Sequence, residues 1–319
     1  MLTETRMILK RFNWFPGRQA WLGALVLALA GCALTPPPPP EATPPVVVTP
    51  PTPPVTLTRA PRLGLAVGGG AARGFAHIGV IQELERVGIR PDLLAGTSVG
   101  SMVASFYGSG MPGKELERLA MGMHEAEIAD WSLPILGRGL LRGEALTRYV
   151  RRAIDGKLLE DMVLPVGVLA TDLRTGRGVL FRRGDAALAV RASSAVPGVF
   201  SPVKIGDAEY VDGGLTAPVP VRQAREMGAE IVLAVDISSV PETNSASGNL
   251  ELLLQTFAIM GQSINRHELA EADLVVRPVL NGMSGADFSS RERAIEAGRQ
   301  AMRAALPRLN ALLAMRRSL

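Results

Sequence analysis

Gly96, Ser98 and Gly100 stand at the spacing Gly-x-Ser-x-Gly, which is the pattern of a nucleophile elbow. An elbow is a sharp turn from a buried strand into a helix that presents a serine hydroxyl in a strained, exposed position. The glycines matter because a side chain at either position would collide with the neighbouring strand or helix. The pattern indicates nucleophilic attack by Ser98, although ordinary strand–helix turns also contain these residues.

A glycine-rich segment, Gly68–Gly74, precedes the elbow and reads Gly-Gly-Gly-Ala-Ala-Arg-Gly. Successive glycines let backbone N–H groups turn towards one point ahead of a helix, and such a point binds an anion. A P-loop is excluded because no Gly-Lys-Ser/Thr follows, and a dinucleotide fingerprint fails because Arg73 replaces a required glycine. The interpretation that remains is an oxyanion hole for acyl transfer.

Arg73 and Asp212 are the charged residues of these motifs. A cation in the first turn of a helix opposes the helix dipole, so Arg73 is interpreted either as a residue that shapes the site or contacts substrate, or as a surface arginine. Asp212 ends a short apolar run, and Gly213 and Gly214 after it keep the approach to its carboxylate open. Asp-Gly is also common in β-turns, so Asp212 alone indicates little.

The elements that must position these residues alternate between apolar strands and helices. Strands are predicted over 62–67, 92–95, 166–170, 231–235 and 274–276, and helices over 73–87, 99–107, 113–123, 144–154, 250–265 and 291–313. Continuous apolar strands between helices predict a three-layer α/β sandwich with a mainly parallel central sheet. Sites in such sheets lie beyond the carboxyl ends of the strands, where the glycine-rich segment and the elbow fall.

The N-terminal region reads as an export signal. Basic residues precede the apolar run 21–30, and Cys32, the only cysteine, follows Leu-Ala-Gly. This arrangement resembles the lipobox of bacterial lipoproteins, in which the cysteine is diacylated. Residues 1–32 are therefore predicted to be a lipoprotein signal peptide with its lipobox; the alternatives are an uncleaved anchor and a soluble export signal. Ala33, rather than aspartate, follows Cys32, so the expected location is the outer membrane, facing the periplasm.

Residues 33–57 form a proline-rich linker, in which 11 of the 19 residues from 36 to 54 are proline. Polyproline II rises about 3.1 Å per residue, so this tract spaces a domain roughly 60 Å from its anchor. Residues 58–319 then form one domain. The formal charge of +4 is scattered, and no basic stripe with interleaved aromatic residues appears, so nucleic acid is not an expected partner.

The glycine-rich loop, the Gly-x-Ser-x-Gly motif and the Asp-Gly-Gly motif, in this order, resemble those of the patatin-like phospholipases over residues 63–240. Segments 170–173 (Ala-Thr-Asp-Leu) and 192–198 (Ala-Ser-Ser-Ala-Val-Pro-Gly) also look like segments of bacterial members. The resemblance implies that Ser98 is the nucleophile and Asp212 the base, and that no metal or cofactor takes part. It also implies an oxyanion loop made of Gly68, Gly69, Gly70, Arg73 and Gly74.

Other titratable residues compete for these roles. His77 lies one turn into the predicted helix after the glycine-rich loop, and it is either a rival base or a packed helix residue. His124 and His267 have no partner motif, and Asp172 and Asp236 follow strands and are interpreted as structural. The stretch 131–141 is interpreted as a cover or acyl-chain contact, or as loop packing.

The expected function is a lipid-anchored serine acyl hydrolase that uses a Ser98–Asp212 dyad and an acyl-enzyme, with phospholipid or another acyl ester as substrate. One alternative is a carboxylesterase or thioesterase for smaller acyl compounds. Another is an envelope lipoprotein that binds lipid without catalysis. Only the enzymes need an activated Ser98.

Overall fold

A computed structural model describes residues 60–128, 130, 138–239, 248–285 and 287–317. The chain divides into two units, Met1–Pro53 and Pro54–Leu319, and the description below concerns the second. The predicted signal peptide, Cys32 and the proline-rich linker lie outside the described residues.

The domain is built on an eight-stranded sheet in the order β10, β9, β1, β2, β4, β8, β7, with β5 also paired to β4. The strands from β10 to β4 are parallel, whereas β5 and β8 run antiparallel to β4, and β7 antiparallel to β8. The strands are β1 (Leu63–Val67), β2 (Leu93–Thr97), β4 (Val166–Asp172), β5 (Gly178–Phe181), β7 (Val203–Ile205), β8 (Ala208–Asp212), β9 (Ile231–Val235) and β10 (Leu274–Val276). A separate pair joins β3 (Gly139–Leu141) to β6 (Gly198–Phe200).

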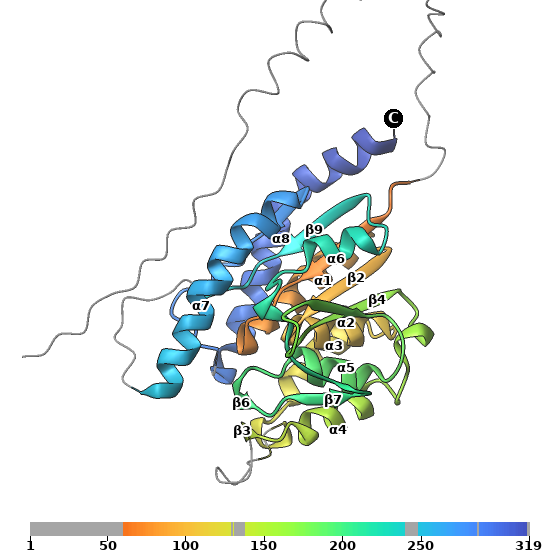
Figure 1. Cartoon of the computed structure of the whole chain (residues 1–319). Coiled ribbons are helices and arrows are strands. Elements are labelled where there is room, and N and C mark those ends of the chain that lie inside the picture. Colours follow the sequence, from red (N-terminus) through yellow and green to blue (C-terminus); the bar gives the residue numbers. More distant parts are fainter. Residues whose placement is uncertain (1–59, 129, 131–137, 240–247, 286, 318–319) are drawn as a thin grey trace, which may run out of the picture. The chain divides into compact units, whose positions relative to one another are not determined.

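Helices cover both faces of the sheet (Figure 1). They are α1 (Phe75–Arg86), α2 (Val99–Gly108), α3 (Gly113–Gly122), α4 (Glu144–Ala153), α5 (Ala186–Ser193), α6 (Val221–Glu226), α7 (Asn249–Glu268) and α8 (Arg291–Arg317). Side chains alternate across a strand, so Leu65 of β1 packs into a core with α1, α2 and α8, whereas Ala66 packs on the other side with α6. The predicted three-layer α/β sandwich with a mainly parallel sheet is confirmed.

The predicted strands and long helices are present with small shifts at their ends, and one shift matters for the site. The sequence predicts a helix from residue 73, but α1 begins at Phe75, after a 3-10 turn over Ala71–Gly74. Ala71 has a φ of 49°, in the left-handed region, so the chain cannot enter an α-helix directly from the glycines.

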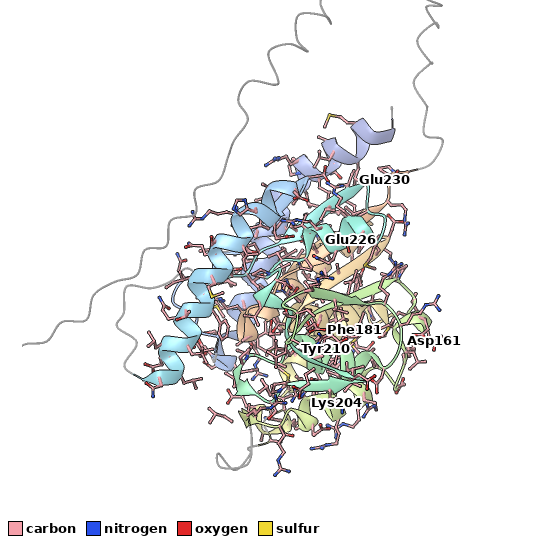
Figure 2. All side chains as sticks on the ribbon, viewed as in Figure 1. Asp161, Phe181, Lys204, Tyr210, Glu226 and Glu230 are labelled. Carbon is pink, nitrogen blue, oxygen red and sulfur yellow. The ribbon has the colours of Figure 1, made fainter. Side chains whose placement is uncertain are left out.

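The sequence analysis does not predict β5 to β8, α5 or α6. The three-stranded edge formed by β5, β7 and β8 is half-buried, so it lacks the continuous apolar runs of the central strands. Phe181 of β5 and Tyr210 of β8 meet edge to face, with ring centroids 5.0 Å apart (Figure 2). This contact fixes β8, the strand that ends at Asp212.

Among the helices that the structure describes, none combines the length and the apolar character needed to cross a membrane.

Candidate active site

Ser98 lies at the turn between β2 and α2, as an elbow requires. Its φ of 54° and ψ of −127° lie outside the regions that L-residues ordinarily adopt, so the surrounding structure must impose them. The Ser98 N–H donates to Ser193 Oγ at 2.8 Å, and Ser101 Oγ donates to the Ser98 carbonyl at 2.6 Å. Ser193 Oγ itself donates to the Leu169 carbonyl at 2.5 Å, which ties the elbow to β4.

The two glycines of the elbow are required by close backbone contacts. A Cβ on Gly96 would lie 2.5 Å from Ser101 Cα, and a Cβ on Gly100 would lie 2.2 Å from the Val67 carbonyl oxygen. These distances are below any real Cβ contact, so α2 could not pack against β1 and β2 with larger residues. The predicted reason for both glycines is confirmed.

The glycine-rich loop lies beside the elbow because β1 and β2 are parallel neighbours. A Cβ on Gly69 would be 3.1 Å from Ser98 Cβ. The Gly68 N–H donates to Val235 O at 3.1 Å and the Gly69 N–H to Pro218 O at 2.9 Å, so both donors are used within the fold. The N–H groups of Gly70 and Ala71 make no hydrogen bond within the described part of the chain.

Two further residues of this region, Arg73 and Gly74, have defined places. Arg73 is buried and lines the cavity beside Ser98, so its interpretation as a surface arginine is wrong. A Cβ on Gly74 would lie 2.4 Å from Val99 Cγ2, so this glycine lets the chain entering α1 pass close to α2.

His77 is fully buried in α1, and its Nε2–H donates to the Gly68 carbonyl at 2.8 Å. Burial lowers the pKa of its imidazole to about 4, against the opposing effects of that hydrogen bond and of Asp236. The ring is therefore neutral at physiological pH and holds the backbone of the glycine-rich loop. Of its two interpretations, the packed helix residue agrees with the structure.

Asp212, at the end of β8, is held by three backbone contacts. Its N–H donates to Ala195 O at 3.0 Å, its carbonyl accepts from Thr171 Oγ1 at 2.9 Å, and its Oδ1 accepts from the Gly214 N–H at 2.7 Å. The second carboxylate oxygen, Oδ2, is buried without a hydrogen bond of good geometry.

The electrostatics of Asp212 follow from this burial. Burial raises the pKa of the carboxyl group to about 6, and the Gly214 N–H and the nearby Ser98 hydroxyl oppose that rise. Since Oδ2 has no well-formed hydrogen bond, the contact with the Ser98 hydroxyl is a loose one. Gly213 does more than keep the approach open, because a Cβ there would lie 2.2 Å from the Leu169 carbonyl oxygen.

Ser98 and Asp212 line one cavity of about 1340 Å³, together with Gly69, Gly70 and Arg73. Most of the remaining lining is apolar and comes from α1, α2, α3, α4 and α7. An apolar cavity with a few convergent polar groups is the usual form of a small-molecule or lipid site.

The other candidate residues lie elsewhere. Asp172 accepts hydrogen bonds from the N–H groups of the turn after β4, at 2.9 and 2.8 Å, and Asp236 pairs with Arg277 at 3.0 Å. His124 and His267 do not line the cavity. Residues 131–137 are outside the described residues, while Leu141 of β3 does line the cavity.

Sequence reasoning missed the hydroxyl groups that hold the site together, at Thr97, Ser101, Thr171 and Ser193. Thr97 Oγ1 donates to Ala217 O at 2.9 Å, across the sheet from the elbow. Segments 170–173 and 192–198 contain two of these residues and already stood out by their resemblance. Their role could not be seen, because Ser193 is 95 residues from its partner Ser98. Within the described residues, no group of three His, Cys, Asp or Glu side chains is arranged to hold a metal ion.

A serine at a strained elbow and a buried carboxylate, both in one apolar cavity at the carboxyl edge of a parallel sheet, define an arrangement suited to lipid hydrolysis. Residues 65–225 match the family model described as patatin-like phospholipase, and the chain belongs to this family.

Related proteins span several kinds of organism. An uncharacterized NTE family protein of Mycobacterium tuberculosis is 35% identical over 180 residues, which cover 56% of this chain and 50% of that protein. The mouse patatin-like phospholipase domain-containing protein 6 is 31% identical over 191 residues, 57% of this chain and 14% of that protein. The chain therefore spans about half the length of the mycobacterial relative or less of the others.

Among solved structures, VipD from Legionella pneumophila superposes with a TM-score of 0.53 and 14% sequence identity, covering 78% of this chain and 67% of VipD. At this identity the likeness concerns the fold alone.

Proposed function

We propose that this protein is a serine acyl hydrolase that cleaves the carboxylic esters of lipids, with phospholipids as the first substrate class. The observation that carries the proposal is the meeting of Ser98, at a strained elbow, with the buried Asp212 in one apolar cavity. Family membership supports hydrolysis of lipid esters, and the geometry supports a Ser98–Asp212 dyad.

In the first half of the reaction, Asp212 takes the proton of Ser98 Oγ while Oγ attacks the ester carbonyl carbon. The bond to the leaving alcohol breaks, and the proton passes from Asp212 to the leaving oxygen. In the second half, Asp212 takes a proton from water, which hydrolyses the acyl-enzyme and releases the fatty acid. A carboxyl group with a pKa of about 6 is ionised at neutral pH, yet is more basic than an ordinary aspartate.

The negative charge on the carbonyl oxygen needs donors that the fold has not used. The N–H groups of Gly68 and Gly69 already bond to backbone carbonyls, so we propose that Gly70 and Ala71 supply the donors of the glycine-rich loop. Gly68 and Gly69 then act by letting the loop lie close to Ser98, and Gly74 by letting α1 pass α2. Arg73 forms part of the cavity wall.

We also propose that Cys32 is diacylated and anchors the protein to the bacterial outer membrane, on its periplasmic side. The proposal rests on the position of the only cysteine behind an apolar run and on the proline-rich linker that follows it.

The function is tested with a fluorophosphonate probe and with hydrolysis of phosphatidylcholine vesicles. The wild-type protein should be labelled and release fatty acid, and Ser98→Ala should abolish the label and reduce turnover by several orders of magnitude. Asp212→Asn should reduce turnover nearly as far, because the two residues act as one unit.

Ser109→Ala is the matched control, because Ser109 caps the other end of α2 and does not line the cavity. This variant should keep wild-type turnover. A folded Ser98→Ala protein that turns over like wild type would overturn the proposal, and vesicle binding without any turnover or label would favour the non-catalytic lipoprotein.

A further inference from the structure

The cavity has two unlike sides on either side of Ser98. On one side lies an arm between α1, α2, α3 and α4, called here the helix arm and defined by Met102, Val103, Phe106, Leu116, Ala120 and Tyr149. On the other side α7 contributes a mixed wall that contains Glu251, Gln255 and Gln262 beside apolar residues. The two sides are therefore suited to chemically different parts of a substrate.

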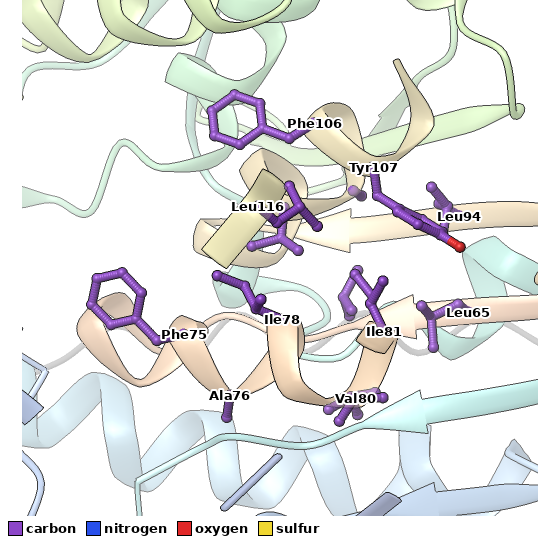
Figure 3. Packing of buried hydrophobic residues seen from close by; sticks show 14 of the residues in the cluster. Leu65, Phe75, Ala76, Ile78, Val80, Ile81, Leu94, Phe106, Tyr107 and Leu116 are labelled. Atoms are coloured by element: carbon purple, nitrogen blue, oxygen red, sulfur yellow. The ribbon is translucent and has the colours of Figure 1, made fainter. Parts of the chain in front are cut away.

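The helix arm begins at the elbow and runs along α2. Since a helix rises 1.5 Å per residue, Met102 lies about 6 Å and Phe106 about 12 Å beyond Ser98 along the helix axis. Leu116 of α3 and Ile78 of α1 lie close together, with Phe106 beyond Leu116 (Figure 3). The Phe106 and Tyr149 rings, with centroids 6.3 Å apart, bring α2 and α4 together at this depth.

The chemistry of the arm restricts what can fill it. Val103, Phe106, Leu116 and Tyr149 are each less than 9% exposed. Glu125, which is exposed, is the one charged residue that the described part of the chain between α2 and α4 contributes to the lining. Water in such a space would find few hydrogen-bonding partners, whereas a hydrocarbon chain gains from leaving water.

We propose that the helix arm binds the acyl chain of the ester under attack, and that its depth makes the protein select long-chain acyl esters. The leaving alcohol then lies against the α7 wall, where polar side chains are available. This inference rests on the proposed hydrolase function and adds the direction in which the substrate lies.

Ala120 provides the test, because it is a small, buried residue of the arm, one turn from Leu116 on the same face of α3. Ala120→Phe should fill the arm. The kcat/KM for a palmitate ester should fall about tenfold or more relative to wild type, while kcat/KM for a butyrate ester stays within about twofold. Met121→Phe, at the neighbouring exposed position outside the cavity, is the matched control and should change neither value.

A second measurement keeps the inference testable if Ala120→Phe does not fold. Wild-type protein is treated with fluorophosphonates that carry an ethyl or a hexadecyl chain, and the labelling rates at Ser98 are compared. Faster labelling by the hexadecyl compound is expected. Equal rates, or an Ala120→Phe protein that loses palmitate and butyrate activity alike, would overturn the helix arm. No labelling by either compound would instead contradict the hydrolase function itself.

Discussion

The backbone of Ser98 keeps an unfavourable conformation because a hydroxyl from another element holds it. Residues in such regions of φ and ψ cost of order 1–3 kcal/mol and persist only where their surroundings over-determine them. Ser193, at the end of α5, accepts the Ser98 N–H and donates to β4, so one side chain links the elbow to its neighbouring strand.

Ser193→Ala should therefore lower kcat with little change in KM. The variant leaves the buried Ser98 N–H without its acceptor, a loss of about 1–3 kcal/mol, and lets the elbow relax away from its attacking geometry. The rate of fluorophosphonate labelling at Ser98 should fall in parallel with kcat. Ser194→Ala, at the adjacent position, is the control; equal labelling of Ser193→Ala and wild type would mean that Ser193 does not position the nucleophile.

The raised pKa of Asp212 predicts the pH dependence of the rate. A base must be ionised to accept the serine proton, so kcat/KM should rise with pH, reach half of its maximum near pH 6 and level off above pH 7. His77, with its pKa lowered to about 4, is neutral throughout this range and should not shape the profile. A half-maximum near pH 4 would contradict the buried, raised carboxyl group.

The same shift predicts how Asp212 affects stability. Its folded pKa of about 6 exceeds the ordinary value of 3.8, so the folded state holds the proton more tightly than the unfolded state. The stability that this group contributes is present below about pH 4 and is lost as pH rises through 6. The loss is about 3 kcal/mol, from two pKa units. Asp212→Asn should thus be more stable than wild type to urea at pH 8 and equally stable at pH 4.

At the scale of elements, glycines set how closely the helices approach the sheet. Gly100→Ala places a Cβ against the Val67 carbonyl oxygen, so α2 must move away from β1. Gly122→Ala is the control, because no atom lies within 4 Å of a Cβ at that position, near the exposed end of α3. Gly100→Ala should lower the free energy of unfolding by several kcal/mol and Gly122→Ala should leave it unchanged or raise it by up to about 1 kcal/mol. Equal urea midpoints would contradict the close packing of the elbow.

The elements that the sequence predicts are those whose signals are local. β1, β2, β9 and β10 are recognisable from their apolar runs, and the elbow from three residues. β5, β7 and β8 owe their pairing to distant partners, so their short, half-buried segments carry no comparable signal. The site follows the same division: Ser98 and Asp212 are predicted from motifs. The loss of the Gly68 and Gly69 donors depends on contacts with Val235 and Pro218 that only the fold creates.

At the scale of the whole molecule, a hydrolase whose acyl-binding arm is apolar needs its substrate delivered from a membrane, and the proposed lipid on Cys32 would keep the domain there. Acyl chains bind a bilayer in proportion to the CH₂ groups they bury, so two chains anchor a protein far more firmly than one. The linker of residues 33–57 would leave the domain room to reach substrate.

Cys32→Ser should separate anchoring from catalysis. The variant should lose radiolabelled palmitate and leave the outer-membrane fraction, because the only thiol of the chain is gone. Its turnover of a soluble butyrate ester, per mole of folded protein, should equal that of wild type, since Ser98 and Asp212 are untouched. Ala33→Ser, which keeps the thiol, should retain the label and the membrane location. An unmodified Cys32 in wild-type membranes, or palmitate that persists in Cys32→Ser, would show that the chain is held at the membrane by another part of its sequence.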